Sequence, residues 1–130
     1  MTYVHSRGEI LVGKIIHYTQ VPRVPVTNAH KTWIRVLISK DDGAITYIMR
    51  IFEIEPEGYI PRHKHPWEHE IFVLEGEGLI TMDEEEHMVR AGMAVFIPPN
   101  VLHSYRNVGD GVWKFICTIP LFPTAPEEGK

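Results

Sequence analysis

The chain gathers three imidazoles in the stretch His63-Lys64-His65-Pro66-Trp67-Glu68-His69-Glu70-Ile71-Phe72-Val73-Leu74. His63 and His65 lie two positions apart, and in an extended strand such residues leave the same face of a sheet. A proline then bends the chain, and His69 opens an apolar run typical of a strand. Three neutral imidazoles that converge on one point form a site for a divalent transition metal. His103, further along the chain, is a fourth candidate ligand.

Size and composition indicate a single domain with a substantial core. The chain has 130 residues, of which 44% are hydrophobic and 23% are charged, and its formal net charge is −4. No basic stripe is present to grip phosphates, so we expect no nucleic-acid partner. No apolar stretch approaches the roughly 20 residues that span a bilayer, so we expect no membrane partner. The first residues lack the form of a signal peptide. Because Cys117 is the single cysteine, the expected compartment is a reducing cytoplasm.

Strand signals dominate the chain and helix signals are almost absent. Short apolar and β-branched runs alternate with Gly- and Pro-rich turns, which is typical of an antiparallel sandwich or barrel. The expected strands are residues 9–19, 32–39, 44–54, 62–65, 70–74, 79–82, 87–90, 94–97, 101–105 and 112–119. We divide the chain into residues 1–40, N-terminal strands that are candidates for exchange within a dimer, residues 41–120, the barrel core, and residues 121–130, an extended or disordered tail.

One motif resembles the first motif of the cupin family. That motif is a glycine, a His-x-His pair, a glutamate three or four residues later, and a second glycine some six residues after that. The corresponding residues here are Gly58, His63, His65, either His69 or Glu70, and Gly76.

A second motif, linked to the first, also resembles the cupin pattern. Its residues here are Gly92, Pro98, Asn100, His103 and Asn107, with matching spacing throughout. Asn100 replaces a glycine of the pattern, and asparagine also tolerates left-handed backbone geometry. The resemblance covers residues 44–119. It implies an all-β, single-domain fold, the double-stranded β-helix or jelly-roll known as the cupin barrel. The stretch 65–74 is most similar to the small single-domain manganese cupins of thermophiles.

Two residues compete for the position that cupins usually give to a glutamate ligand. Six residues separate His69 from Gly76, as the motif requires, whereas Glu70 leaves only five. Neighbours on a strand face opposite ways, so only one of the two can look into the barrel. Either choice gives an acceptable apolar lining, so the spacing decides in favour of His69. The resemblance then implies a ligand set of His63, His65, His69 and His103.

A site of four neutral imidazoles leaves the charge of a dication largely uncompensated. We therefore expect it to attract anionic or enolisable oxygen compounds to its vacant positions. Imidazole suits Mn, Fe, Cu, Ni and Zn alike, and raw affinity favours Cu or Zn. The family resemblance favours Mn or Fe.

Several other residues are candidates for the surroundings of the metal. Arg50 interrupts an apolar strand, either facing solvent or anchoring an anionic ligand. On the last strand, Phe115 and Cys117 belong to the less polar face, which should point inward, and Ile60 lies at the mouth. Glu68 and Glu70 could orient the imidazoles by accepting hydrogen bonds. The substrate pocket is therefore expected to comprise Arg50, Ile60, Phe115 and Cys117.

Two classes of function fit these residues. The first is a metal-dependent oxidoreductase of the dioxygenase type, in which the metal carries the chemistry, since no nucleophile–base pair is evident. The second is a non-redox isomerase, lyase or decarboxylase, or a non-catalytic cupin that senses a small acid. Of these two classes we expect the first, a metal-dependent oxidoreductase. A homodimer is also expected, because a single barrel carries exposed strand edges that require cover.

Overall fold

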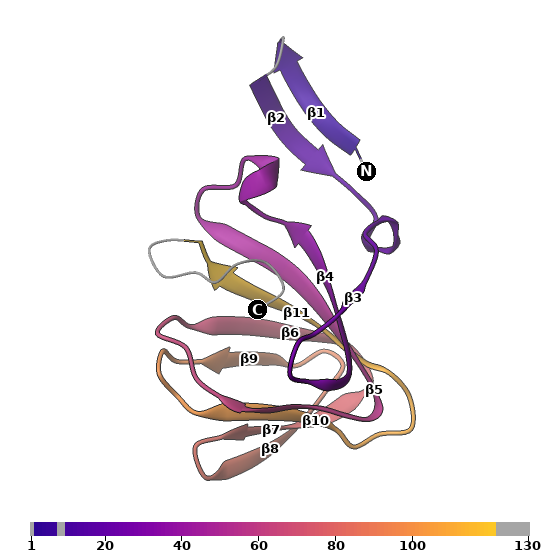
Figure 1. The fold of residues 1–130 in the computed structure, drawn as a ribbon, viewed down its shortest axis with the longest axis vertical. Helices are drawn as coiled ribbons and strands as arrows, with labels where there is room; N and C mark the ends of the chain where they lie inside the picture. The colour runs from indigo at the N-terminus through magenta and orange to yellow at the C-terminus, as the bar shows by residue number, and fades with distance from the viewer. Residues whose placement is uncertain (1, 8–9, 122–130) are drawn as a thin grey trace.

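The computed structural model describes the backbone of residues 2–7 and 10–121 and the side chains of residues 13–121. These residues form eleven strands and two short 3-10 turns, with no α-helix among them (Figure 1). The strands are β1 (Thr2–Arg7), β2 (Ile10–Ile15), β3 (Val24–Pro25), β4 (His30–Ile38), β5 (Tyr47–His63), β6 (His69–Glu75), β7 (Glu77–Met82), β8 (Glu85–Arg90), β9 (Ala94–Ile97), β10 (His103–Asn107) and β11 (Trp113–Pro120). The 3-10 turns are η1 (Tyr18–Gln20) and η2 (Lys40–Asp42). No helix in this described part of the chain is long and apolar enough to cross a membrane.

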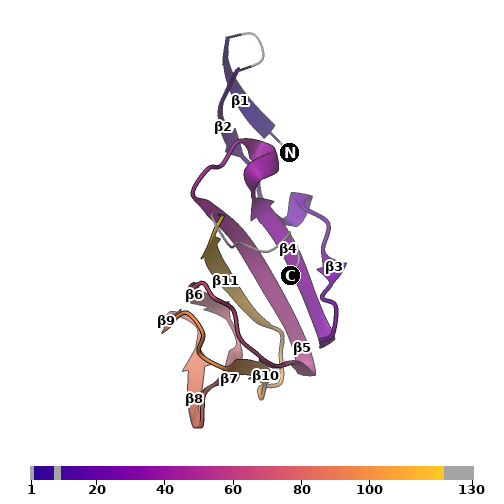
Figure 2. The ribbon, with the colours of Figure 1, turned by 60° about the vertical axis from the view of Figure 1, so that its left-hand side comes forward.

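A nine-stranded antiparallel sheet curls on itself to form a jelly-roll barrel (Figures 1 and 2). Its main path runs β8-β7-β10-β5-β11-β6-β9, and β4 joins β5 with β3 beside it. The all-β jelly-roll fold expected from the sequence is therefore confirmed. The strands β1 and β2 form a separate two-stranded hairpin that stands away from the barrel.

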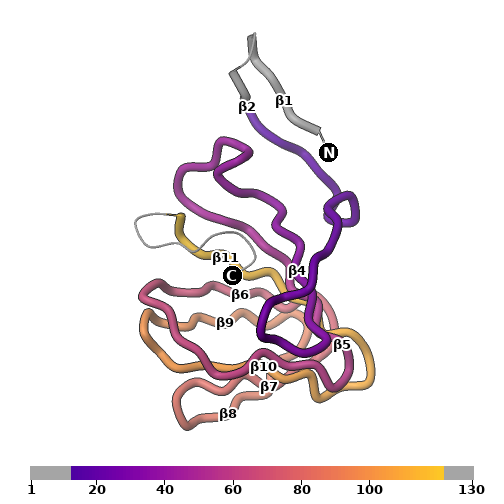
Figure 3. Tube along the Cα trace, viewed as in Figure 1, coloured from indigo at the N-terminus to yellow at the C-terminus, as the bar shows by residue number. Residues whose placement is uncertain are grey.

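Strand β5 organises the barrel because it changes partners along its length. Residues 47–54 pair with β11, whereas residues 59–63 pair with β10. The sequence predicted a turn at residues 55–58 that would split this segment into two strands, and that prediction is wrong. Glu57 adopts a left-handed φ of 72°, which bends the strand without ending it. The bend falls where the pairing partner changes, so the long strand follows the curl of the sheet (Figure 3).

The N-terminal segment also differs from the sequence prediction of one strand over residues 9–19. Strand β2 ends at Ile15, and η1 begins at Tyr18 with His17 as its cap. The Nδ1 of His17 accepts a hydrogen bond from the N–H of Thr19 at 3.3 Å, and the N–H of His17 donates to the side-chain oxygen of Gln20 at 3.0 Å. A histidine is an unusual cap, so the sequence offered no clear signal for this turn. Strand β1 was not predicted. The proposed tail lies outside the described residues, apart from Leu121.

Alternation along β11 confirms which side chains face the interior. The set Trp113, Phe115, Cys117 and Ile119 is fully buried, whereas the intervening residues are only half-buried. The register pairs Phe115 with Phe52 and Cys117 with Arg50 on β5. Directly opposite residues of an antiparallel pair share a face of the sheet, so these side chains point into the same interior.

The outer face of β4, β5 and the start of β11 is covered by the chain itself. The buried carboxylate of Glu53 accepts hydrogen bonds from Arg35 at 3.0 Å and from Arg23 at 3.3 Å. Lys114 of β11 donates to the hydroxyl of Tyr18 at 2.9 Å. These contacts hold residues 18–23 against the sheet, so this half of the outer face is closed to solvent.

The side chain of Asn107, the last residue of the second motif, links three segments by hydrogen bonds. Its amide nitrogen donates to the carbonyl of Ile54 on β5 and to that of Gly111, each at 2.8 Å. Its amide oxygen accepts from the N–H of Gly109 at 2.8 Å. The side chain is buried, so the loop that leads into β11 depends on it.

Replacing Asn107 by alanine should therefore destabilise the fold. Buried partners left without a hydrogen bond cost about 1–3 kcal/mol, and urea unfolding monitored by circular dichroism measures the loss. Val108→Ala is the matched control, because Val108 is the next residue and is exposed. Equal stabilities of the two variants would contradict the role assigned to Asn107.

Candidate metal centre

Three strand ends and one loop bring four histidines together at one end of the barrel. His63 is the last residue of β5, His69 the first of β6 and His103 the first of β10, while His65 lies in the loop after β5. The register of β5 and β10 places His103 opposite His63. His103 of the second motif, 34 positions after His69 in the sequence, thus meets the histidines of the first motif in space.

The four rings form a closed circuit of neighbours. Ring centroids are 4.9 Å apart for His63–His65, 5.3 Å for His65–His69, 4.8 Å for His69–His103 and 4.3 Å for His103–His63. The diagonal pair His65–His103 is 6.1 Å apart. With metal–nitrogen distances of about 2.1 Å, ligand rings at right angles around one ion would have centroids about 4.5 Å apart, and opposite rings about 6.5 Å. The observed spacings follow this pattern.

The nitrogen atoms of the four imidazoles do not point at a common centre in this structure. Among the described residues, no three or more His, Cys, Asp or Glu side chains form a group that could hold a metal ion in their present orientations. The ring centres nevertheless have positions that suit one shared ion, because the backbone sets these positions. Rotation of an imidazole about its Cβ–Cγ bond exchanges its nitrogen and carbon positions while moving the ring centre little, so donor atoms would reach such an ion only after side-chain rotation.

Backbone carbonyls orient two of the rings. The Nδ1 of His63 lies 2.8 Å from the carbonyl oxygen of Pro61, and the Nδ1 of His103 lies 2.8 Å from that of Val101. An Nδ1–H that donates to a carbonyl leaves Nε2 with its lone pair, which is the form that binds metals. These contacts could not be predicted from the sequence, since every residue carries a carbonyl.

Two buried imidazole nitrogens of the cluster lack a hydrogen-bond partner among the described residues, Nδ1 of His69 and Nε2 of His103, as do the indole nitrogens of Trp67 and Trp113. A buried polar atom without a partner costs free energy, and such atoms in native structures require an explanation. A metal bound to the four rings would supply one.

Burial keeps three of the imidazoles neutral, those of His65, His69 and His103. Loss of solvation lowers the pKa of His69 from 6.5 to about 2, with further lowering by His103 and Arg50. Burial likewise lowers the pKa of His65 and of His103 to about 4 each. The Val101 carbonyl opposes the shift at His103 by favouring its protonated form. Neutral imidazole is the form that donates a lone pair to a metal.

The loop residue His65 is held by two contacts. The ring of Trp67 stacks on it with centroids 4.4 Å apart and an angle of 8° between planes. The carbonyl of His65 accepts a hydrogen bond of 2.7 Å from the N–H of Asn100. Asn100 adopts a left-handed φ of 64°, as expected for a residue in the place of a glycine.

Arg50, whose orientation the sequence left open, points into the barrel. It is 3% exposed, and its Nη2 donates to the sulfur of Cys117 at 3.1 Å. Its guanidinium lies 5.0 Å from the ring centroid of Phe52. Its charge contributes to lowering the pKa of both His65 and His69. Arg50 thus faces the histidine cluster.

An aromatic group lies between the histidines and the core. The ring of Tyr105 stands edge-on to His103 at 5.5 Å and stacks on Phe115 at 5.4 Å. Phe115 in turn stacks on Phe52 at 5.5 Å. Phe115 and Cys117 lie on the interior face, where the sequence placed them, and Tyr105, which the sequence offered as a nearby titratable group but which the expected pocket did not include, lies beside the rings. Its position two residues after His103, on the same face of β10, was the available signal.

The remaining candidates lie further from the rings. Ile60 is half-buried, packs against the core and pairs with Tyr105. Glu70 is exposed on the outer face of β6, whereas His69 is buried, so the parity argument places His69 on the interior side. A hydrogen bond with Glu70 raises the pKa of Glu68. Among the described residues, neither carboxylate bonds to an imidazole, so orientation of the rings by Glu68 and Glu70 stays a prediction.

A curled jelly-roll with a histidine cluster at the strand ends defines a cupin. The Cupin domain family matches residues 50–119, and the chain belongs to that family. Among solved structures, the polyketide cyclase RemF from Streptomyces resistomycificus has a TM-score of 0.79 and 33% identity, over 87% of this chain and 82% of RemF. A predicted oxalate decarboxylase from Thermotoga maritima has a TM-score of 0.73 but 22% identity, over 84% of this chain and all of that one, which shows the fold alone.

Among curated proteins, polyketide synthase CurC from Streptomyces cyaneus is 33% identical over 86 residues, which are 65% of this chain and 54% of CurC. The matched region spans about half the length of the first curated relatives: 45%, 50% and 54% of them.

Metal content should depend on all four histidines. His63→Ala, His65→Ala, His69→Ala and His103→Ala should each lower occupancy strongly, because three imidazoles remain to replace the water of the ion. Elemental analysis of protein purified without added metal measures this. His87→Ala, an exposed ring on β8, is the matched control and should keep full occupancy, and the same is expected for His5, His17 and His30. Full occupancy in His69→Ala with loss in Glu70→Ala would show that Glu70 is the ligand.

The metal-free protein should lose stability as the pH falls from about 6.5 to about 4. Below 6.5 the unfolded chain protonates its histidines, whereas the folded chain holds His65 and His103 neutral down to about 4. The unfolded state then binds more protons than the folded state, so the free energy of unfolding decreases as the pH is lowered. Urea midpoints at several pH values measure the slope. His69→Leu should reduce it and His87→Leu should not, and a flat profile in the wild type would contradict burial of neutral rings.

Proposed function

We propose that this cupin is a metal-dependent enzyme that acts on a flat, enolisable polycarbonyl or phenolic compound, with His63, His65, His69 and His103 as ligands of a divalent metal. The observation that carries the proposal is the closed circuit of four rings with unpartnered buried nitrogens on His69 and His103. Mn or Fe is favoured by the resemblance of the motifs, and Zn, Ni and Cu also suit imidazole ligands. The metal, when bound, would polarise substrate oxygens as a Lewis acid. The single buried cysteine fits a cytoplasmic setting.

Arg50 would bind and orient the substrate. Its buried guanidinium faces the cluster closely enough to affect His65 and His69. Charge-assisted hydrogen bonds from a guanidinium to an enolate or carboxylate oxygen are about twice as strong as neutral ones. The hydrogen bond to Cys117 holds Nη2 of the Arg50 guanidinium, so the orientation of the guanidinium is set before a ligand binds.

The aromatic side chains would select a flat substrate. The ring of Tyr105 lies beside His63 and His103, and the buried rings of Phe115 and Phe52 are stacked behind it. Burial raises the pKa of the Tyr105 phenol well above its ordinary value. Tyr105 therefore stays protonated near neutral pH, so that it can donate a hydrogen bond to a substrate oxygen but cannot serve as a base. Burial also raises the pKa of the Cys117 thiol, which argues against a nucleophilic role for it.

The comparisons favour non-redox chemistry over the dioxygenase reaction expected from the sequence. RemF is named a polyketide cyclase and CurC a polyketide synthase, and polyketides are rich in enolisable carbonyl groups. A cyclisation joins an enolate carbon to a carbonyl carbon of the same molecule and releases water, with no oxidant. We therefore propose cyclisation of a polyketide-like compound, and retain dioxygenation as the second outcome of the test.

The deciding experiment compares aerobic and anaerobic turnover of metal-loaded protein with linear 1,3-diketones and poly-β-ketones. With the poly-β-ketones, mass spectrometry should show a product lighter by one water, formed equally with and without oxygen, whereas the simple 1,3-diketones are too short to cyclise and report only on oxygen-dependent turnover. Oxygen uptake in step with product would support the dioxygenase instead. No turnover in either atmosphere, together with tight binding of small acids, would indicate the binding or sensing role.

Arg50→Gln should weaken ligand binding by about 1.5–3 kcal/mol, the value of a hydrogen bond to a charged group. Phe115→Leu should relax the choice of ligand, and metal content should stay near that of the wild type in both variants. Calorimetric titration with small diketones and carboxylates measures the affinities. Arg106→Gln is the matched control, because Arg106 is exposed on β10. Unchanged affinities in Arg50→Gln and Phe115→Leu would place both side chains outside the pocket.

A further inference from the structure

The indole N–H of Trp67 is buried beside the candidate metal centre. Trp67 lies in the loop between β5 and β6, and its half-buried side chain packs against the core. Its ring is nearly parallel to that of His65, with centroids 4.4 Å apart and an angle of 8° between planes. Its Nε1 has no hydrogen-bond partner among the described residues. A buried donor without an acceptor costs free energy, so its presence next to a histidine cluster requires an explanation.

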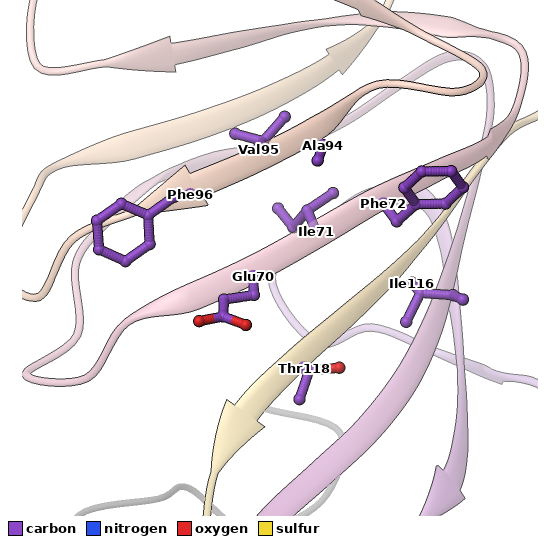
Figure 4. A pocket seen from close by; sticks show the side chains of 8 residues that line it. All are labelled: Glu70, Ile71, Phe72, Ala94, Val95, Phe96, Ile116 and Thr118. Carbon is purple, nitrogen blue, oxygen red and sulfur yellow. The ribbon is translucent and has the colours of Figure 1, made fainter.

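The two carboxylates that flank Trp67 in the sequence do not accept this hydrogen bond. A hydrogen bond joins Glu68 to Glu70. Glu70 is exposed on β6 and lines a groove on the outer face of the sheet, where Thr118 of β11 is its neighbour (Figure 4). His69 is buried on the opposite face of β6. Both acids therefore belong to the outer side, so we look for the acceptor among groups that bind at the histidines.

The other two tryptophans serve as references for Trp67. The Nε1 of Trp33 donates to the carboxylate of Glu55 at 2.6 Å. The Nε1 of Trp113 is buried and, among the described residues, also lacks a partner. Trp113, however, is fully buried in the core at the start of β11, away from the end of the strand that pairs with the beginning of β6. Trp67 is therefore the tryptophan whose unsatisfied N–H lies at the histidines.

The polar atoms left unpaired at the centre are of two complementary kinds. Nδ1 of His69 and Nε2 of His103, which have no hydrogen-bond partner among the described residues, can offer lone pairs to a cation. Nε1 of Trp67 can instead donate a hydrogen bond to an oxygen. A divalent metal alone would engage the histidines and leave the indole N–H unsatisfied, whereas a metal that carries a carboxylate or enolate oxygen would satisfy both kinds of atom.

The stacking geometry leaves room for such an oxygen. A metal bound by an imidazole lies near the plane of that ring, because the lone pair of the nitrogen lies in the plane. The rings of His65 and Trp67 are 8° from parallel with centroids 4.4 Å apart, so an oxygen bound to the metal on the side of Trp67 would lie between the two planes. A metal–oxygen bond of about 2.1 Å spans about half of that separation, and the remainder is within reach of an N–H···O hydrogen bond of about 2.9 Å.

We propose that Trp67 is a ligand-binding residue, whose indole N–H donates a hydrogen bond to the anionic oxygen that binds the metal and whose ring positions His65. The proposal rests on the metal centre of the proposed function and specifies its ligand as a carboxylate or an enolate. A hydrogen bond to a charged oxygen is stronger than one between neutral groups, so Trp67 should favour an anion over a neutral carbonyl compound. One side chain thus has two separable tasks, ligand recognition by the N–H and support of a histidine by the ring.

Two substitutions separate these tasks. Trp67→Phe keeps an aromatic ring against His65 and removes the N–H, whereas Trp67→Leu removes both. The probes are zinc, which suits imidazole ligands, and acetate. Zinc-loaded Trp67→Phe should bind acetate at least about tenfold more weakly than the wild type, as expected for a lost hydrogen bond to a charged group, with little change in zinc affinity. Trp67→Leu should in addition release zinc faster to a chelator. Trp33→Phe, which removes the indole N–H at Glu55, is the matched control and should bind zinc and acetate like the wild type.

Nuclear magnetic resonance of the indole N–H groups provides a readout that does not depend on turnover. The chain has three tryptophans, so we expect three indole signals, and the signal that Trp67→Phe lacks belongs to Trp67. Acetate should move this signal downfield in the zinc-loaded wild type and leave it in place in the zinc-free protein. The signals of Trp33 and Trp113 should stay in place in both.

The outcomes distinguish this proposal from the proposed function. A wild type that binds no zinc would refute the metal centre, and the proposed function with it. A zinc-loaded wild type that binds no acetate would refute the anionic ligand. Zinc binding with an acetate affinity that folded Trp67→Phe leaves unchanged, or with an unmoved Trp67 signal at saturating acetate, would refute the role of the N–H alone. Equal loss of zinc in Trp67→Phe and Trp67→Leu would show that the indole only supports the loop. Circular dichroism checks folding, and Trp67→Met, which also lacks the N–H, replaces Trp67→Phe if the latter is not folded.

Discussion

The alternation of side chains along β5, β6 and β11 is the constraint on which the rest of the structure depends. In β6 it sends His69 inward and Glu70 outward. In β5 and β11 the register brings Arg50 opposite Cys117 and Phe52 opposite Phe115. A slip of one residue would exchange the two faces of a strand. It would move a histidine of the cluster to the surface and bury groups that now face solvent, so one register sets the interior and the outer face together.

This constraint carries an electrostatic consequence for the interior. The fold buries His69, His103 and the guanidinium of Arg50, and sets the half-buried rings of His63 and His65 beside them. Desolvation disfavours the charged form of an imidazole, so the pKa values of His65, His69 and His103 are lowered and these rings are neutral. The guanidinium of Arg50 is the positive group beside them. The result is a cluster of lone-pair donors beside a fixed cation. Such an arrangement favours a bound cation on one side and an anionic oxygen on the other, which is the pair of charges that an enolate bound to a metal presents.

The sequence was sufficient for the parts of the molecule that depend on periodicity and spacing. Alternation predicted the inward face of β11, and residues 94–97 were predicted with the bounds of β9. Spacing brought His63 and His103 into one candidate site, and the structure places their rings 4.3 Å apart. What escaped prediction depends on the backbone in three dimensions. A Glu-Pro-Glu-Gly stretch has the composition of a turn, yet Glu57 bends β5 without ending it because the strand finds a new partner there. The orientation of Arg50 could be decided only after β11 was seen beside β5.

The position of His65 in a loop bears on how fast an ion would exchange at the candidate metal centre. Three of the four clustered rings are carried by strand ends that share the stability of the sheet, whereas His65 lies in the loop between β5 and β6. That loop is fastened by the stacked ring of Trp67 and by the amide of Asn100, a residue of the second motif. Local opening of a loop requires less free energy than opening of a core strand. An ion at this centre would therefore enter and leave by release of one imidazole while the barrel stays closed. Its residence time would be set by how firmly the turn at Asn100 holds the loop, rather than by the stability of the fold.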